Sequence, residues 1–160
     1  MGRLKPEKCE MADTYYSINI HYVFSTKGRV PLIAGELMDR LPQFIGGILR
    51  QHGAKALSVG GTADHLHILA SLPASLSVSK AAQLVKGGSS KWVHDTFPNK
   101  REFSWQEGYA AFSVSVSQIP ATAVYIENQA KHHLKKSFME EYISFLKKHG
   151  VEYDERYLWG

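Results

Sequence analysis

Two histidines in one short apolar segment are the first residues whose types and spacing suggest chemistry. His65 and His67 lie one residue apart in ADHLHILAS, residues 63–71. Alternate residues of a strand point to the same side, so the two imidazoles are expected to face together. Neutral imidazoles coexist easily when they bind one cation. The pair alone does not establish a metal site, because a metal ion usually has a third protein ligand. Two partly exposed histidines on a sheet face would show the same spacing.

A second segment, AVYIENQAKHHL at residues 123–134, offers that third ligand. Helical spacing places Tyr125, Asn128, Gln129 and His132 on one stripe. A separate apolar stripe is expected to pack against the sheet: Ala123, Ile126, Ala130 and Leu134. Tyr125 therefore lies off the packing stripe and beside an amide four residues later, although a surface tyrosine would show the same spacing.

Together these side chains suggest phosphoryl transfer. Gln129 could complete a His-His-Gln cation site with His65 and His67, leaving coordination positions for phosphate oxygens. Such a cation would polarise the phosphate for attack. Tyr125 would then be the nucleophile, and a covalent phosphotyrosine would conserve the bond energy for later rejoining.

Hydrophobic patterning predicts the elements that position these residues. Strict alternation or short apolar runs predict strands, and 3.6-residue spacing predicts helices. The expected strands are residues 15–26, 55–61, 65–72 and 109–117, and the expected helices are 35–53, 77–97, one beginning near Pro120, and 137–150. The order β-α-β-β-α-β followed by two C-terminal helices predicts an α+β fold, a ferredoxin-like split unit with an antiparallel sheet.

The predicted arrangement places the first two helices on one sheet face. The other face is expected to stay open and polar, with Asn19, His21 and Ser113 on it. Pro42 is expected to bend the first helix unless it lies in the first turns, and the Gly87-Gly88 pair is expected to interrupt the second. The last helix is expected to begin with a capping box, Ser137 with Glu140, and to end at Gly150.

Composition narrows the class of protein. The chain has 160 residues, a formal charge of +4 and a single cysteine, Cys9. One cysteine excludes an intrachain disulfide and fits the cytoplasm. No apolar run approaches the roughly 18 residues of a membrane span, so no membrane contact is expected. Residues 1–14 are interpreted as a polar leader and residues 15–160 as one domain. The mild basic excess favours a polyanionic partner.

The chain resembles the single-tyrosine HUH transposases of the insertion-sequence-200 type, which include tyrosine transposases associated with repeated extragenic palindromes (REP). Three motifs in order carry the resemblance: HLH at 65–67, then WQEGYAAFSVS, then YIENQ. It implies a ferredoxin-like fold and cleavage of single-stranded DNA with hairpin ends. It also implies Mg²⁺ or Mn²⁺ held by His65, His67 and Gln129, with Tyr125 forming a 5′-phosphotyrosine and releasing a 3′-OH.

The resemblance further implies an obligate homodimer acting on DNA in a bacterial or archaeal cell. The strands of two subunits would pair into one sheet, and the tyrosine helix could complete the partner's site in trans. Basic residues near the expected site are candidates for phosphate contacts: Lys27, Arg29, Lys86, Lys91, Lys131, Lys135 and Lys136. Trp92 and Trp105 could stack on bases, but packing is favoured for both.

Two alternatives stay open at this point. One is a metal hydrolase that uses His65 and His67 while Tyr125 is only structural. The other is a host-retained or inactive DNA-binding relative that keeps the fold. The residues alone do not separate a mobile transposase from a settled copy, and they name neither the DNA hairpin nor the cleavage sequence.

Overall fold

The computed structural model describes residues 14–133 and 136–159, so the predicted leader, apart from Thr14, lies outside the described residues. The strands are β1 Asn19–Ser25, β2 Lys55–Thr62, β3 His65–Ser71 and β4 Ala110–Ser113. The helices are α1 Glu36–Gln51, α2 Val78–Thr96, α3 Ile119–Glu127, α4 Gln129–His132 and α5 Phe138–Lys148.

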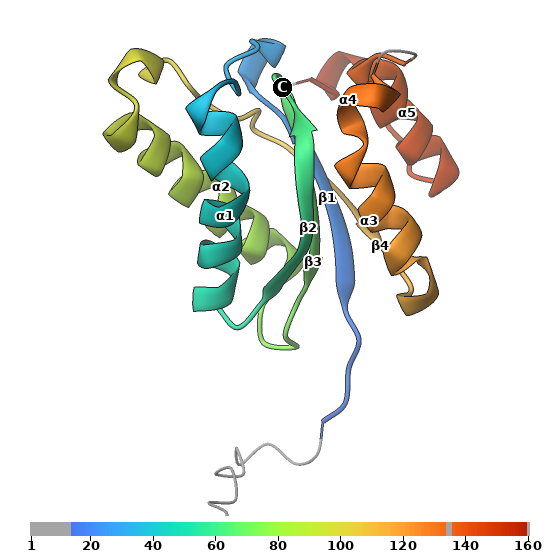
Figure 1. Cartoon of the computed structure of the whole chain (residues 1–160). Coiled ribbons are helices and arrows are strands. Elements are labelled where there is room, and N and C mark those ends of the chain that lie inside the picture. The colour runs from blue at the N-terminus through green and yellow to red at the C-terminus, as the bar shows by residue number, and fades with distance from the viewer. Residues whose placement is uncertain (1–13, 134–135, 160) are drawn as a thin grey trace, which may run out of the picture.

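The four strands form one sheet in the order β2-β3-β1-β4, and every neighbouring pair is antiparallel. The two connections β1-α1-β2 and β3-α2-β4 both place their helix on the same face of this sheet (Figure 1). This strand order and helix placement are those of the ferredoxin-like split unit. The predicted α+β class and topology are therefore confirmed.

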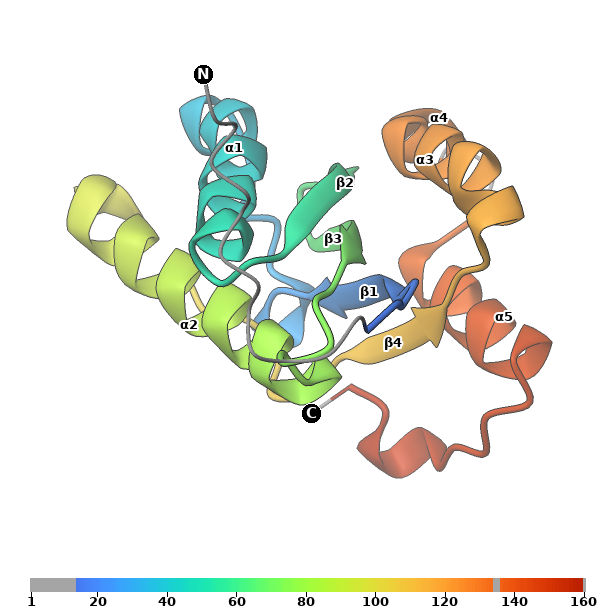
Figure 2. The same ribbon diagram turned by 90° about the horizontal axis from the view of Figure 1, so that it is seen from below.

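The second sheet face is covered, which corrects the expectation of an open face. Helices α3, α4 and α5 lie against it, opposite α1 and α2 (Figure 2). All seven residues of β1 are buried, including Asn19 and His21, whereas Ser113 is exposed. The expectation was wrong because polar alternation was interpreted as solvent contact. The C-terminal helices carry apolar faces of their own, and the sheet is the surface that buries them.

Two apolar clusters fill the space on the two sides of the sheet. The cluster under α1 and α2 is the larger, and its strand residues include Ile20, Tyr22, Phe24, Leu66, Ile68 and Ala70. The smaller cluster joins β1 and β4 to α5 and consists of Val23, Ala110, Phe112, Phe138, Tyr142 and Leu146. The sheet is thus the middle layer of three, and β1 and β3 are its most buried strands.

Helices α1 and α2 are both uninterrupted, so the predicted break at Gly87-Gly88 was wrong. Helix α1 also continues past Pro42. A Cβ placed on Gly88 would lie only 2.9 Å from the Cδ1 atom of Ile48. Gly88 therefore permits the close approach of α2 to α1 rather than ending the helix.

Strand β4 is shorter than the predicted strand at 109–117. It pairs with β1 only from Ile20 to Val23, and one further backbone bond joins the amide of Val114 to the carbonyl of Asn19 at 2.9 Å. Because β1 begins at Asn19, the remaining alternating residues have no strand to pair with, and the chain turns towards α3.

The described part of the C-terminal region contains three α-helices instead of the two expected, with short 3-10 turns at Val116–Gln118 and Glu155–Tyr157. Asn128, with φ −98° and ψ 22°, separates α3 from the single turn α4. The predicted cap of the last helix is confirmed, since the Ser137 hydroxyl accepts a hydrogen bond from the Glu140 amide. Gly150 follows α5 with φ +66°, as expected for a glycine just beyond a helix end. In the described part of the chain, no helix has the length and apolar character needed to cross a membrane.

Candidate active site

The two strand histidines lie on the sheet face that α3, α4 and α5 cover. His65 and His67 are both fully buried, because β3 is an inner strand of the sheet and these helices cover its face. Their neighbour Leu66 belongs to the cluster under α1 and α2. The period-two reading of HLH is therefore confirmed, and the two imidazoles point to the same face.

The tyrosine and glutamine of YIENQ meet these histidines within the same chain. Gln129 is buried, and its Oε1 atom lies 3.0 Å from Nε2 of His65. The rings of Tyr125 and His67 are 5.7 Å apart between centroids. Of the apolar stripe predicted beside them, Ile126 is buried but Ala130 is exposed, and Leu134 lies outside the described residues.

A glycine allows the tyrosine helix to lie this close to the sheet. A Cβ on Gly60 of β2 would stand 2.4 Å from the carbonyl oxygen of Ile126, a separation that real side chains do not reach. Gly60 pairs with His67 across the β2–β3 ladder. The contact between α3 and β2 therefore sets the distance from Tyr125 to the histidines.

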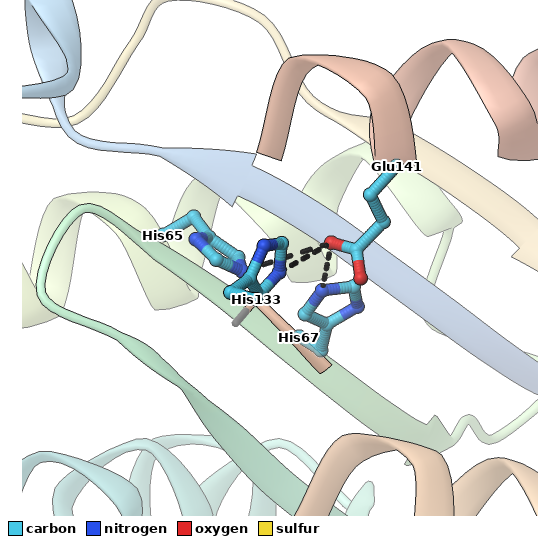
Figure 3. A group of neighbouring side chains, drawn as sticks. All are labelled: His65, His67, His133 and Glu141. Carbon is cyan, nitrogen blue, oxygen red and sulfur yellow. Dashed lines mark hydrogen bonds and ion pairs between the residues drawn. The ribbon is translucent and has the colours of Figure 1, made fainter. Parts of the chain in front are cut away.

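Glu141 and His133 complete the cluster, and neither was assigned a role from the sequence (Figure 3). The Oε1 atom of Glu141 lies 2.9 Å from Nε2 of His67, 3.2 Å from Nε2 of His133 and 3.7 Å from Nε2 of His65. The other carboxylate oxygen accepts the hydroxyl hydrogen bond of Tyr125. The donor atoms of the three histidines and Glu141 all lie within 4.8 Å of one another, so the cluster could hold a metal ion.

Different signals mark these two additional residues. His133 follows Gln129 by four residues, so helical spacing could have placed it beside Gln129. Glu141 stands on α5, beyond a loop, next to the capping residue Glu140. An acidic residue in a first helical turn is common for dipole reasons alone, so its sequence position carried no sign of a site.

A second set of contacts orients the two strand histidines. The Nδ1 atom of His65 lies 2.8 Å from Oδ1 of Asp64, which also accepts a 3.0 Å bond from the Thr62 hydroxyl. The Nδ1 atom of His67 lies 2.8 Å from Nε2 of His21. Ring nitrogens held in this way fix the tilt of both imidazoles, and the Asp64 carboxylate also favours the hydrogen on Nδ1 of His65.

Burial and hydrogen bonding set the charges of the site. Burial would raise the pKa of Glu141, but the hydrogen bond from His67 and its neighbours outweighs it and lowers that pKa to about 2. Burial, together with the Glu141 carboxylate, raises the pKa of Tyr125 well above its usual value. Burial lowers the pKa of His67 and brings that of His21 to about 3. The site therefore combines the neutral imidazoles of His21 and His67 with a carboxylate and a protonated phenol.

A pocket of about 370 Å³ opens beside the phenol, between α3 and α5. Tyr125, Glu141 and His21 form part of its wall, and Lys136 and Lys148 add two cationic side chains. The nucleophile candidate thus borders a space with positive charge at its edge, which suits an anionic ligand.

The predicted DNA-contact residues lie on both sides of the sheet. The expectation that Lys86 and Lys91 lie near the site was wrong, because both are on α2, which covers the opposite sheet face (Figure 2). Lys27 and Arg29 form the turn after β1, and the Arg29 guanidinium lies over the ring of Trp159 at 5.3 Å. Lys131 is exposed on α4. Lys135 lies outside the described residues, and the DNA contacts of all these residues stay predictions.

Two of the lysines already have partners within the chain. Lys86 donates to the carbonyl oxygens of residues 106–108 at 2.6–3.0 Å. Lys91 forms an exposed ion pair with Asp95 at 2.7 Å. The tryptophans pack as expected, since Trp105 is buried and Trp92 stacks on Phe44 with 4.4 Å between ring centroids.

Comparisons with known proteins identify the family of this chain. The family model described as "Transposase IS200 like" matches residues 14–129. The ISDra2 transposase TnpA of Deinococcus radiodurans is 24% identical over 119 residues, which cover 71% of this chain and 85% of that protein. The transposase of insertion sequence IS200 from Salmonella typhimurium is 27% identical over 140 residues, covering 84% and 88%.

Two solved structures share the fold. A crystal structure described as a transposase from Deinococcus radiodurans aligns with a TM-score of 0.61 at 23% identity, covering 74% of this chain and 95% of that one. A REP-associated tyrosine transposase bound to a REP hairpin aligns with a TM-score of 0.55 at 13% identity, covering 79% and 74%. With the family model matching most of its length, this chain belongs to the IS200-like transposase family.

Proposed function

We propose that this chain cleaves and rejoins single-stranded DNA through a covalent 5′-phosphotyrosine on Tyr125. One observation carries the proposal: the Tyr125 hydroxyl and His67 contact the same carboxylate, that of Glu141. A phenol from a helix and an imidazole pair from a strand are therefore neighbours in one buried cluster. Membership of a transposase family supports strand transfer as the overall reaction.

The donor set fits a divalent cation. His65 and His67 present Nε2 atoms to the same region, and the Oε1 atom of Gln129 lies 3.0 Å from the first of them. The proposed ion is Mg²⁺ or Mn²⁺, held by His65, His67 and Gln129. When bound, it supplies positive charge that polarises the scissile phosphate.

The side chains of the chain would carry out the remaining steps. The Tyr125 oxygen attacks phosphorus, and the bond from phosphorus to the 3′ oxygen breaks. That oxygen takes up a proton in exchange for the one that the phenol loses, and a strand with a 3′-OH is released. Glu141 Oε2 already accepts the phenol hydrogen bond and is placed to receive its proton. Rejoining reverses these bonds: a 3′-OH attacks the phosphotyrosine, and the phenol recovers its proton.

The proposed substrate is single-stranded DNA with hairpin ends. A structural neighbour that binds a REP hairpin supports this substrate class. The proposed assembly is a homodimer in the cytoplasm. The described chain brings Tyr125 to its own histidines, and exchange of the tyrosine helix between subunits would produce the same cluster in trans.

The alternatives account for fewer of these contacts. A metal hydrolase with a merely structural Tyr125 gives no reason for the phenol to contact the carboxylate of the cluster. An inactive DNA-binding relative gives no reason for His65, His67, Gln129 and Tyr125 to lie together.

A labelled hairpin oligonucleotide tests the proposal. We expect purified protein with Mn²⁺ to form a denaturation-resistant protein–DNA adduct, and we expect Tyr125→Phe to bind the DNA without forming it. Tyr109→Phe is the matched control, because its ring lies beside Tyr22 on the opposite sheet face. Cleavage without an adduct would favour the hydrolase, and binding without cleavage would favour the inactive relative.

A further inference from the structure

Two histidines of the cluster have their Nδ1 atoms occupied by acceptors. The Nδ1 atom of His65 lies 2.8 Å from the Asp64 carboxylate, and that of His133 lies 2.6 Å from the backbone carbonyl of Lys136. A carbonyl or an ionised carboxylate can only accept, so each Nδ1 must carry the hydrogen. The Nε2 atom of each ring is then the one that faces the centre of the cluster.

Both Nε2 atoms face the same two oxygen atoms. His65 Nε2 lies 3.0 Å from Oε1 of Gln129 and 3.7 Å from Oε1 of Glu141, and His133 Nε2 lies 3.0 Å and 3.2 Å from the same two atoms. The Gln129 orientation is fixed by its amide nitrogen, which donates to the Tyr125 carbonyl at 3.3 Å. Two imidazole nitrogens and two oxygen atoms therefore converge on one region, an arrangement that a single cation can bridge.

The rings of the three histidines also stand close together. The rings of His65 and His133 are 4.5 Å apart between centroids, and that of His67 is 5.3 Å from His65. A single metal ion can bind all of these nitrogen and oxygen atoms at once.

We propose that His133 and Glu141 are metal ligands together with His65 and His67, and that this centre binds a first-row transition-metal ion such as Zn²⁺ or Mn²⁺ in preference to Mg²⁺. The inference rests on the metal site of the proposed function and extends it. Both added ligands lie beyond Gln129, where the match to the family model ends.

The separations fit one coordination sphere. Ligand bonds of about 2.0–2.1 Å in a tetrahedral site place neighbouring donor atoms roughly 3.3 Å apart. The three histidine nitrogens lie 2.9, 3.2 and 3.7 Å from Oε1 of Glu141. The outer contacts agree as well, because metal-bound histidines usually donate their second ring N–H to a carboxylate or a backbone carbonyl.

The donor chemistry selects the class of metal. Mg²⁺ prefers oxygen ligands and keeps several of its water molecules. A buried set of three imidazoles provides nitrogen ligands instead. Imidazole nitrogens suit zinc and other transition metals. The second oxygen of Glu141 accepts the Tyr125 hydroxyl, so one carboxylate would anchor both the ion and the nucleophile.

Metal titration of the full chain without DNA tests this inference. Metal-depleted protein is titrated with Zn²⁺, Mn²⁺ and Mg²⁺ in a calorimeter. We expect Glu141→Gln and His133→Ala each to weaken Zn²⁺ binding about tenfold or more. The controls Glu140→Gln and His52→Ala, which alter exposed residues, are expected to retain the affinity of the unchanged protein. Unchanged affinity in either cluster variant, or equal affinity for Mg²⁺ and Zn²⁺, would overturn the inference.

A measurement on the unaltered chain covers the case in which a variant does not fold. X-ray absorption of the Zn²⁺-loaded protein counts imidazole ligands, with three expected, and a count of two would overturn the inference. Neither experiment involves DNA. A chain that fails these tests yet forms the Tyr125 adduct keeps its proposed function, and a chain that binds Zn²⁺ as expected but forms no adduct loses it.

Discussion

The two faces of strands β1 and β3 are buried to the same degree but are built from different chemistry. Towards α1 and α2 they present side chains such as Tyr22 and Leu66 to an apolar cluster. Towards α3–α5 they present His21, His65 and His67. An apolar face needs only complementary shape, whereas each buried polar group needs a matched partner. Among the described residues, no buried side-chain nitrogen or oxygen lacks a hydrogen bond.

Burial alone therefore does not distinguish the site from the rest of the core. What marks it is a polar network placed where apolar packing would have been sufficient. Such a network is compatible with a stable fold only if each of its polar groups has a hydrogen-bond partner, because a half-satisfied network destabilises the protein. Substitutions on the apolar face are expected to change stability, and substitutions on the polar face are expected to change the chemistry.

Neighbouring substitutions on β3 should have opposite effects. We expect His65→Ala to lower adduct formation by about 10²-fold or more while much of the DNA binding remains, because a metal ligand is lost. Leu66→Ala should lower the free energy of unfolding by about 2–5 kcal/mol, since it leaves a cavity in the apolar cluster. Adduct yield per folded molecule and denaturant unfolding provide the two measurements.

Two outcomes would contradict these expectations for His65→Ala and Leu66→Ala. A His65→Ala protein that cleaves at the original rate with metal present would remove His65 from the site. A Leu66→Ala protein that is fully folded but inactive would show that the apolar face also takes part in the chemistry.

DNA binding should depend steeply on salt if cations around the polar face contact phosphates. Four such contacts on a single strand would weaken binding roughly 50-fold between 50 and 200 mM salt. Lys131→Ala should flatten the logarithmic slope by about 0.7. Lys55→Ala is the control, because Lys55 lies at the end of the β2–β3 hairpin away from His65. A flat salt response would argue against a nucleic-acid partner.

Gly60→Ala should push α3 off the sheet. The added methyl group would meet the Ile126 carbonyl, and we expect a loss of about 1–3 kcal/mol of stability, as for overpacked sites. Adduct formation should also slow, because Tyr125 moves with its helix. Thermal unfolding and single-turnover cleavage measure the two effects, and unchanged values for both would show that the α3–β2 contact does not set the site.

The smallest effect is expected at Gly87 on the other side of the sheet. A Cβ there would meet no atom within 4 Å. Gly87→Ala should therefore raise the free energy of unfolding by about 0.5–1 kcal/mol, because alanine favours a helix interior. Cleavage should be unchanged. A destabilised variant would mean that α2 needs the freedom of Gly87.

The sequence was most informative where local periodicity decides the outcome. Period two placed His65 and His67 together, and the spacing of four placed Gln129 beside Tyr125. The order of elements was enough to predict the ferredoxin-like sheet. These relations need no knowledge of distant parts of the chain.

Long-range packing was beyond such reasoning. Nothing in the local pattern shows that α5 returns over the sheet, so Glu141 could not be placed and the face carrying His21 was expected to be open. Gly88 was interpreted as a break because a glycine signals a break and a close helix contact equally well. Whether polar alternation faces solvent or a second layer depends on what the rest of the chain covers.

The β2–β3 hairpin gathers Thr62, Asp64, His65 and His67 within six residues of chain. Closing so short a loop costs little entropy, so this half of the centre can assemble early in folding. Tyr125, Gln129 and Glu141 arrive from more than fifty residues further along. The proposed exchange of the helical half with a second copy of the chain would therefore leave the hairpin half intact.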